Sequence, residues 1–130
     1  MKIKLVFFLC IVGLSLKMNA QEKIWLDGNL KETNQSRSVF YKIEKLAGKK
    51  SIIYFKNGNI FRKYFSVNKR KKGKFEEYYS TGELKTVGTF ENDLEEGIWK
   101  TYYKSGKIKE RGKYKNGEKV GVWKTFYKNI

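Results

Sequence analysis

The sequence predicts an all-β fold, an antiparallel β-meander of repeated hairpins that forms a single twisted sheet behind a signal peptide. The first observation is a 24-residue period, since the chain resembles itself when shifted by that length. The second is that glycines and aromatic residues keep their positions from one period to the next. Self-similarity at a fixed period of this size is typical of repeat proteins. The columns are Gly73, Gly97 and Gly121, then Phe75, Trp99 and Trp123, then Tyr78-Tyr79, Tyr102-Tyr103 and Phe126-Tyr127.

Residues 1–20 predict a signal peptide. Lys2 and Lys4 form a basic start, Leu5–Leu16 is an almost wholly apolar run, and Ala20 offers a small residue for cleavage. The run is too short to span a bilayer comfortably as a permanent helix. The alternative is an uncleaved N-terminal membrane anchor. Either version exports the remainder, to the periplasm, the outer envelope or the medium.

Residues 21–50 predict an N-terminal capping segment for the repeats. An Asp27-Gly28 turn signal between apolar residues indicates a short hairpin or an extended lead-in. The polar stretch Thr33–Ser38 indicates a loop, Val39–Ile43 a strand, and the glycine-containing stretch Lys45–Lys50 a second loop. Terminal units of repeat proteins are commonly atypical in this way.

Residues 51–130 predict the hairpin repeats, and their register can be worked out. In the hairpin that opens at Gly97, a tight turn centred on Ser105-Gly106 sets each cross-strand pair. The expected pairs are Lys104 with Lys107, Tyr103 with Ile108, Thr101 with Glu110 and Trp99 with Gly112. Because side chains alternate between the faces of a strand, we expect these pairs to share one face with Tyr114, which we call the aromatic face.

Each large aromatic residue faces a glycine in this register, so we expect the glycine to let the ring lie over the backbone. The same register in the preceding hairpin pairs Tyr79 with Leu84, Glu77 with Thr86 and Phe75 with Gly88. One hairpin earlier, Ser51 and Tyr64 take these two columns with the large and small residues exchanged. One large residue per pair is kept, as expected if the pair fills a fixed volume.

The connections between hairpins also carry turn signals. Asn116-Gly117 is among the strongest short hairpin signals, and Asn92-Asp93 stands at the same place one period earlier. Both are expected to return the chain into the next strand. The cationic stretch Lys69–Lys72 occupies the corresponding connection before them and is expected to be an exposed turn.

The opposite face of the central hairpin is strongly basic, and we call it the basic face. It is expected to pair Ile98 with Lys113, Lys100 with Arg111 and Tyr102 with Lys109. The candidate binding residues on it are Lys100, Tyr102, Lys109, Arg111 and Lys113, with Lys74, Tyr78 and Lys85 extending it in the preceding hairpin. The whole chain has a formal net charge of +16. Such a surface either serves solubility or attracts anionic lipid headgroups, acidic glycans or nucleic acid; export argues against nucleic acid.

A second candidate surface is the last expected strand, which begins at Val122. Its hairpin stops early, so the strand has no successor in the sequence and its edge can pair with another chain. The candidate edge residues are Trp123, Thr125 and Tyr127. Little in the sequence covers the aromatic face either, so some of its rings are candidates for a protein-binding patch.

The residue types needed for catalysis are scarce. The chain has no histidine, and its one cysteine, Cys10, lies in the apolar run of the predicted signal peptide. This excludes Ser-His and Cys-His pairs and most transition-metal sites from the exported domain. Glu76-Glu77 and Glu95-Glu96 are adjacent on expected strands and would point to opposite faces. We therefore expect no enzyme activity, no metal and no cofactor.

The hairpin pattern also resembles a known family. Gly-x-aromatic-x-x-Tyr-Tyr-x-x-Gly-x-apolar-x-x-x-Gly-x-aromatic-x-Asn, carried by Gly97–Asn116 and nearly matched by Gly73–Asn92, resembles the MORN repeat variant family. The resemblance implies a sheet of hairpins that serves as a scaffold or interaction surface without catalytic residues. Bacterial members often carry an antitoxin-like label. Similar repeats behind a short aromatic-rich segment, which Gln21–Ile43 resembles, also occur in envelope proteins of Bacteroidetes-type bacteria.

These observations lead to one functional expectation and one alternative. We expect a non-enzymatic, exported interaction or scaffold module at the bacterial cell envelope, with a protein partner and a further contact to anionic lipid or glycan. The alternative is a cytoplasmic antitoxin-like protein that neutralises a toxin by direct binding. The sequence leaves the identity of the partner and the oligomeric state open.

Overall fold

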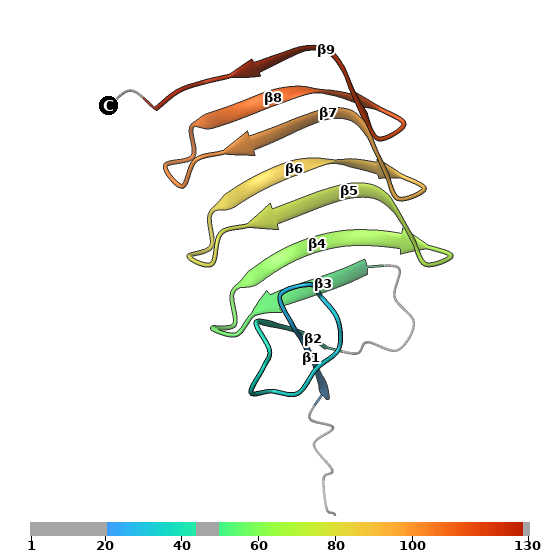
Figure 1. The fold of residues 1–130 in the computed structure, drawn as a ribbon, viewed down its shortest axis with the longest axis vertical. Helices are drawn as coiled ribbons and strands as arrows, with labels where there is room; N and C mark the ends of the chain where they lie inside the picture. The colour runs from blue at the N-terminus through green and yellow to red at the C-terminus, as the bar shows by residue number, and fades with distance from the viewer. Residues whose placement is uncertain (1–20, 44–49, 129–130) are drawn as a thin grey trace, which may run out of the picture.

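A computed structural model of the chain describes residues 21–43 and 50–128. The described residues contain no helix and form one nine-stranded antiparallel sheet, in which every strand pairs with the next along the chain (Figure 1). The strands are β1 (Lys23–Leu26), β2 (Phe40–Ile43), β3 (Lys50–Phe55), β4 (Ile60–Val67), β5 (Arg70–Tyr78), β6 (Leu84–Glu91), β7 (Leu94–Tyr102), β8 (Ile108–Lys115) and β9 (Glu118–Thr125). The predicted meander is confirmed. The predicted signal peptide lies outside the described residues.

The N-terminal segment continues the sheet, since β1 pairs with β2 and β2 pairs with β3. After β1, the carboxylate of Asp27 accepts hydrogen bonds from the backbone N–H groups of Asn29 (2.8 Å) and Lys31 (3.0 Å), which fixes the predicted turn. Residues 44–49, where a second loop was expected, lie outside the described part of the chain. Lys50, assigned to that loop, begins β3.

Two-residue turns join β4 to β5, β6 to β7 and β8 to β9. The central residues are Asn68-Lys69, Asn92-Asp93 and Asn116-Gly117, and all of them have positive φ, between 49° and 81°. A type I′ turn requires this conformation at both positions, and asparagine and glycine adopt it most readily. The turns predicted at Asn92-Asp93 and Asn116-Gly117 are confirmed. The exposed turn predicted at Lys69–Lys72 is wrong after Lys69, because Arg70 already begins β5.

The turn between β7 and β8 is longer than predicted. The backbone N–H of Tyr103 donates to the carbonyl of Lys107 (2.9 Å), and the N–H of Gly106 donates to the carbonyl of Tyr103 (2.9 Å). Gly106 has a φ of 85°. These bonds close a loop of Lys104, Ser105 and Gly106, a three-residue type in which glycine takes the left-handed position.

The longer loop changes the pairing beside it. Tyr102 is opposite Ile108, so the predicted pairs Lys104 with Lys107, Tyr103 with Ile108 and Tyr102 with Lys109 are wrong. A β-bulge at Lys109 absorbs the extra residue, and from Thr101 with Glu110 onward the predicted register is confirmed. The preceding hairpin repeats this arrangement with Tyr78, in place of Tyr79, opposite Leu84, while Glu77 with Thr86 and Phe75 with Gly88 are confirmed.

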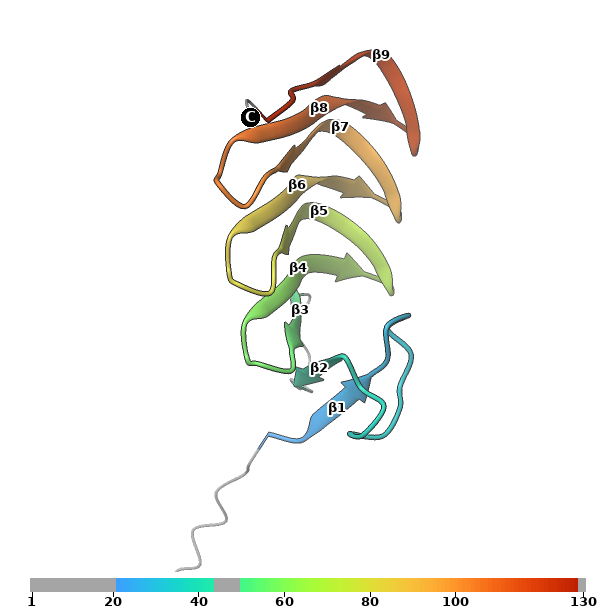
Figure 2. The ribbon, with the colours of Figure 1, turned by 60° about the vertical axis from the view of Figure 1, so that its left-hand side comes forward.

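The glycines that open each repeat lie at bends in the sheet. Gly73, Gly97 and Gly121 have φ values of 86°, 72° and 65°, and the register between adjacent hairpins shifts opposite each of them. Glycine adopts this backbone conformation without steric cost, and a bulge bends the strand that carries it. Figure 2 shows the resulting bend in β5, β7 and β9.

The bend brings each indole ring onto a glycine of the preceding hairpin. A Cβ atom added to Gly88 would overlap the ring of Trp99, and one added to Gly112 would overlap the ring of Trp123. The ring nitrogens of the two tryptophans donate to the carbonyls of Thr89 and Lys113, each at 3.2 Å. The expectation that a glycine makes room for each large ring is confirmed. The glycine expected for Trp99 was wrong, because Trp99 is opposite Gly112 in register but its ring lies on Gly88.

The buried residues form two clusters that meet at Tyr64. One contains Phe75, Phe90 and Trp99, the other Leu26, Phe40 and Ile53, and all six are at most 8% exposed. Ser51 is opposite Tyr64, as predicted, and the tyrosine packs against both clusters. The core is therefore a row of apolar side chains along the sheet, in which rings predominate.

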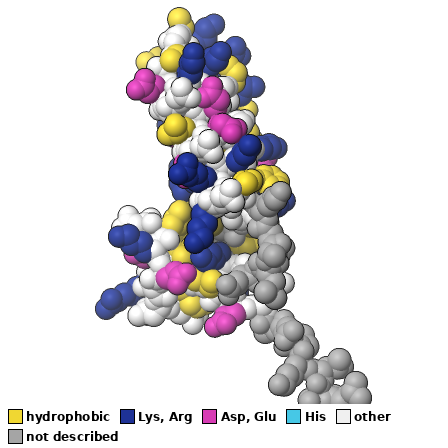
Figure 3. All heavy atoms as spheres, turned by 90° about the vertical axis from the view of Figure 1, so that its right-hand side faces the viewer, with side chains coloured by type: hydrophobic (Ala, Val, Ile, Leu, Met, Phe, Trp, Pro, Cys, Tyr) yellow, Lys and Arg dark blue, Asp and Glu magenta, His cyan; other side chains and the backbone are white. Residues whose placement is uncertain are grey.

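Adjacent hairpins are also joined along both edges of the sheet. On one edge, the hydroxyl groups of Tyr79 and Tyr103 donate to the carbonyls of Tyr102 (2.7 Å) and Phe126 (2.9 Å). On the edge with the two-residue turns, the backbone N–H groups of Asp93 and Gly117 donate to carbonyls of the preceding hairpin. Figure 3 looks onto this second edge and shows cationic and anionic side chains along the stack.

The contact between Trp123 and Gly112 predicts a coupled effect on stability. Gly112→Ala should lower the free energy of unfolding by about 2 kcal/mol because its Cβ displaces the ring, whereas Lys113→Ala should change it by less than about 0.5 kcal/mol. In a Trp123→Leu background the cost of Gly112→Ala should fall by about half or more, and in a Trp99→Leu background it should not. Urea unfolding of the variants measures each free energy. If the cost of Gly112→Ala falls only in the Trp99→Leu background, the observed packing of Trp123 on Gly112 is contradicted.

The edge hydrogen bonds predict a smaller effect. Tyr79→Phe removes the donor to the carbonyl of Tyr102 and should lower the free energy of unfolding by about 1 kcal/mol. Tyr127→Phe is the matched control, because Tyr127 holds the same repeat position and is 85% exposed. Equal stability of the two variants would show that the hydroxyl bond contributes nothing.

Candidate functional site

The basic face carries a row of like charges. Lys100 of β7 is opposite Arg111 of β8, which is opposite Lys124 of β9. We call these three residues the basic row. Like charges directly opposite each other destabilise a sheet. Lys113 adds a further cation opposite Ile98, and among the described residues none of these four cations takes part in an ion pair.

Two predicted members of this surface lie elsewhere in the hairpin. The bulge separates Lys109 from Tyr102, and the ammonium of Lys109 lies 5.9 Å from the ring centroid of Tyr103. Lys85 holds the same repeat position, and its ammonium lies 3.3 Å from the carboxylate of Glu77. Lys85 and Lys109, the residues at the two β-bulges, thus point away from the basic row. Lys124, which the sequence reasoning missed, replaces them; the pairing of β9 with β8 would have indicated it.

The preceding hairpin does not extend the free positive charge. Lys74 forms an ion pair with Glu76 at 2.6 Å, and this hydrogen bond lowers the pKa of the Glu76 carboxyl and raises the pKa of the Lys74 ammonium. Lys85 is paired with Glu77, which also binds Arg62 at 2.6 Å. Both lysines that were expected to extend the basic face are therefore paired with carboxylates.

Apolar side chains protrude among these cations. Ile98 is 56% exposed and Val122 is 81% exposed. Both alternate along their strands with buried or half-buried tryptophans, Trp99 and Trp123, so they project from the side opposite the aromatic face. The surface is therefore amphipathic as well as basic.

The predicted edge residues lie on β9 and just after it. β9 is the last strand of the described sheet and pairs with β8. Trp123 lies in β9, but its ring packs on Gly112 and lies 5.0 Å from the ring of Tyr114. Thr125 ends β9 opposite Glu110, and Tyr127 follows the strand with 85% of its surface exposed.

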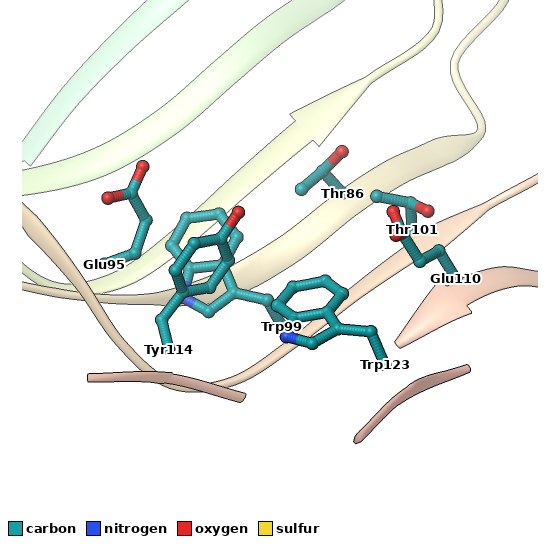
Figure 4. A pocket seen from close by; sticks show the side chains of 7 residues that line it. All are labelled: Thr86, Glu95, Trp99, Thr101, Glu110, Tyr114 and Trp123. Carbon is teal, nitrogen blue, oxygen red and sulfur yellow. The ribbon is translucent and has the colours of Figure 1, made fainter. Parts of the chain in front are cut away.

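The aromatic face contains a pocket of about 190 Å³. Figure 4 shows the rings of Trp99, Tyr114 and Trp123 in its centre, Glu95 on one side, and Glu110 with two threonines on the other. Tyr114 stands nearly edge-on to both indoles, with interplanar angles of 76° and 80°. The predicted pair of Thr101 and Glu110 indicated part of this lining. Glu95 could not be placed from the sequence, because the bend at Gly97 breaks the simple alternation of faces.

Two further kinds of feature are absent from the described residues. In this part of the chain, no group of three or more Asp and Glu side chains is arranged to hold a metal ion. Residues 21–43 and 50–128 also include no helix of the length and apolarity needed to cross a bilayer.

Comparison with known proteins agrees with the hairpin pattern. Residues 71–92 and 95–116 each match the family model described as MORN repeat variant. The first segment covers β5 and β6 almost completely, and the second covers most of β7 and all of β8. No curated protein and no solved structure matches the chain. Two adjacent segments of the chain therefore match the MORN repeat variant model, and each is folded as one β-hairpin.

Proposed function

We propose that this protein is a non-enzymatic interaction module, exported to the bacterial cell envelope, whose basic row attaches it to an anionic lipid surface. The aromatic face on the other side of the same strands remains open to a protein partner. The observation that carries the proposal is the direct opposition of Lys100, Arg111 and Lys124. This arrangement costs folding free energy, and an anionic surface would turn the same charges into an attraction.

The exposed apolar residues favour lipid over glycan as the anionic surface. Ile98 and Val122 project among the cations, and apolar side chains of this kind enter the boundary between headgroups and acyl chains. Each Lys or Arg close to an anionic leaflet contributes about 1 kcal/mol. The basic row and Lys113 thus provide attraction of about 4 kcal/mol, enough for reversible attachment that salt weakens.

Export is supported by the pattern of residues 1–20. The basic start, the apolar run and the small residue at Ala20 are the features of a secretory signal. A second candidate function is the cytoplasmic antitoxin-like one, which the two MORN-variant repeats support by family resemblance. In that case residues 1–20 would not act as a signal peptide, and the protein would neutralise a toxin in the cytoplasm.

The membrane proposal predicts opposite effects of one substitution on binding and stability. Arg111→Glu should weaken binding to vesicles with about 30% anionic phospholipid by about tenfold or more. The same change should raise the free energy of unfolding by about 0.5 kcal/mol, because it places opposite charges between Lys100 and Lys124. Vesicle co-sedimentation and urea unfolding measure the two quantities.

The control is Lys104→Glu, which makes the same change in net charge in the exposed loop between β7 and β8. It should leave vesicle binding within about twofold of the unmodified protein. Equal losses in both variants would show that only net charge matters. If the unmodified protein binds a soluble acidic polysaccharide but does not bind vesicles, the ligand of the basic row is a glycan and the lipid proposal is wrong.

The export proposal predicts where the protein is found and what its N-terminus is. After cell fractionation the protein should occur in the envelope or the medium, and its N-terminal sequence should begin at Gln21. Cytosolic protein that retains residues 1–20 would contradict the proposal and favour the antitoxin-like function. Envelope protein that retains these residues would indicate the N-terminal anchor.

A further inference from the structure

Lysine side chains cover the rings of the aromatic face in two of its hairpins. The ammonium of Lys71 lies 4.7 Å from the ring centroid of Phe90, and that of Lys119 lies 4.1 Å from the ring of Trp123. The Lys119 ammonium is also 3.5 Å from a carboxylate oxygen of Glu110. A cation over an aromatic face is attracted by the electron-rich ring.

The hairpin between them has an acidic residue in place of the lysine. Glu95 stands 24 residues after Lys71 and 24 residues before Lys119, so the three occupy one column of the repeat. In the described residues no cation lies over the ring of Trp99 or Tyr114, and no ion pair includes Glu95. These rings therefore lack the cation that their neighbours have, and a carboxylate lies beside them.

We propose that this pocket binds a lysine side chain of a partner protein. The ligand would place its ammonium among the rings of Trp99, Tyr114 and Trp123, between the side of the pocket that carries Glu95 and the side that carries Glu110. One lysine of the chain itself makes contacts of this kind, because the ammonium of Lys119 lies over the ring of Trp123 and near the carboxylate of Glu110. In the central hairpin Glu95 replaces the lysine of this column, so we infer that the lysine comes from the partner.

The lining favours a primary ammonium over a quaternary one. A primary ammonium has three N–H donors and can bond to a carboxylate at the side of the pocket while its stem lies on the rings. A quaternary ammonium has no donor and would use the rings alone. The volume of about 190 Å³ is below the usual range for pockets of drug-sized ligands, which fits one side chain.

The inference adds a partner chemistry to the interaction module and does not depend on attachment to a membrane. The pocket lies on the aromatic face and the basic row on the opposite face, so the two proposals use different residues. Loss of vesicle binding in Arg111→Glu and loss of lysine binding in a pocket variant would be separate results.

The test uses Nα-acetyl-lysine N-methylamide as the probe and the norleucine analogue, which lacks the ammonium, as its control. Titration of the full chain, followed by the indole N–H signals of Trp99 and Trp123 in NMR spectra, should give a Kd on the order of millimolar for the lysine probe. The norleucine analogue should produce no saturable shift. Equal binding of the two probes would overturn the proposal.

Variants of the lining residues identify the site. Glu95→Gln should weaken binding by about fivefold or more, because it removes one charge that faces the ammonium. Lys119→Gln should strengthen it, since the internal competitor for Trp123 and Glu110 is gone. Glu118→Gln is the matched control, because Glu118 is the exposed first residue of β9 beside Lys119, and it should change nothing. Unchanged affinity in both Glu95→Gln and Lys119→Gln would overturn the assignment.

The trimethyllysine analogue of the probe checks the chemical class. We expect it to bind more weakly than the lysine probe, since it cannot donate hydrogen bonds to the carboxylates. Tighter binding that is insensitive to Glu95→Gln would show a cage for quaternary ammonium groups and contradict the inference.

Discussion

The structure depends on the packing of an indole ring against a glycine of the hairpin before it. A sheet of one layer has no second layer to bury its apolar side chains, so they must pack along the sheet itself. Trp99 lies on Gly88 and Trp123 on Gly112, and each ring also donates a hydrogen bond to the carbonyl of the residue after that glycine. The contact joins consecutive hairpins, and the bend at the positive-φ glycine of each repeat makes it geometrically available.

The same packing separates the two faces of the sheet. On the inner side of the bend, rings occupy the centre and Glu95 and Glu110 lie at the sides, so a cation is favoured there. On the outer side, alternation along β7, β8 and β9 leaves Lys100, Arg111 and Lys124 opposite one another. Both surfaces use the same strands, because the described residues form one sheet and no second layer among them covers either face. A chain with a net charge of +16 thus retains one local site suited to a positive group.

Much of this architecture follows from the period and from the alternation of side chains. Trp99 with Gly112, Lys100 with Arg111 and Ser51 with Tyr64 are correct pairs that need only a count of residues. The turn at Ser105-Gly106 was wrong by one residue, because Ser-Gly suits both a two-residue turn and the end of a three-residue loop. The bulges at Lys109 and Gly97 interrupt the alternation of side chains, so the faces on which Lys109 and Glu95 lie could not be counted from the sequence. Counting within one hairpin also cannot show that a ring packs on the neighbouring hairpin, which is why the partner of Trp99 was wrong.

The meander order has an energetic consequence. Every substantial contact between strands of the described sheet joins neighbours in sequence, so the free energy of the fold is close to a sum of hairpin terms and nearest-neighbour terms, as in a one-dimensional chain. The hairpins with a neighbour on each side are held most firmly, and the sheet opens from its ends. A change in one hairpin is felt by the adjoining hairpins and fades beyond them. Repeats can therefore diverge, as Glu95 does in the column of Lys71 and Lys119, without disturbing the rest of the stack.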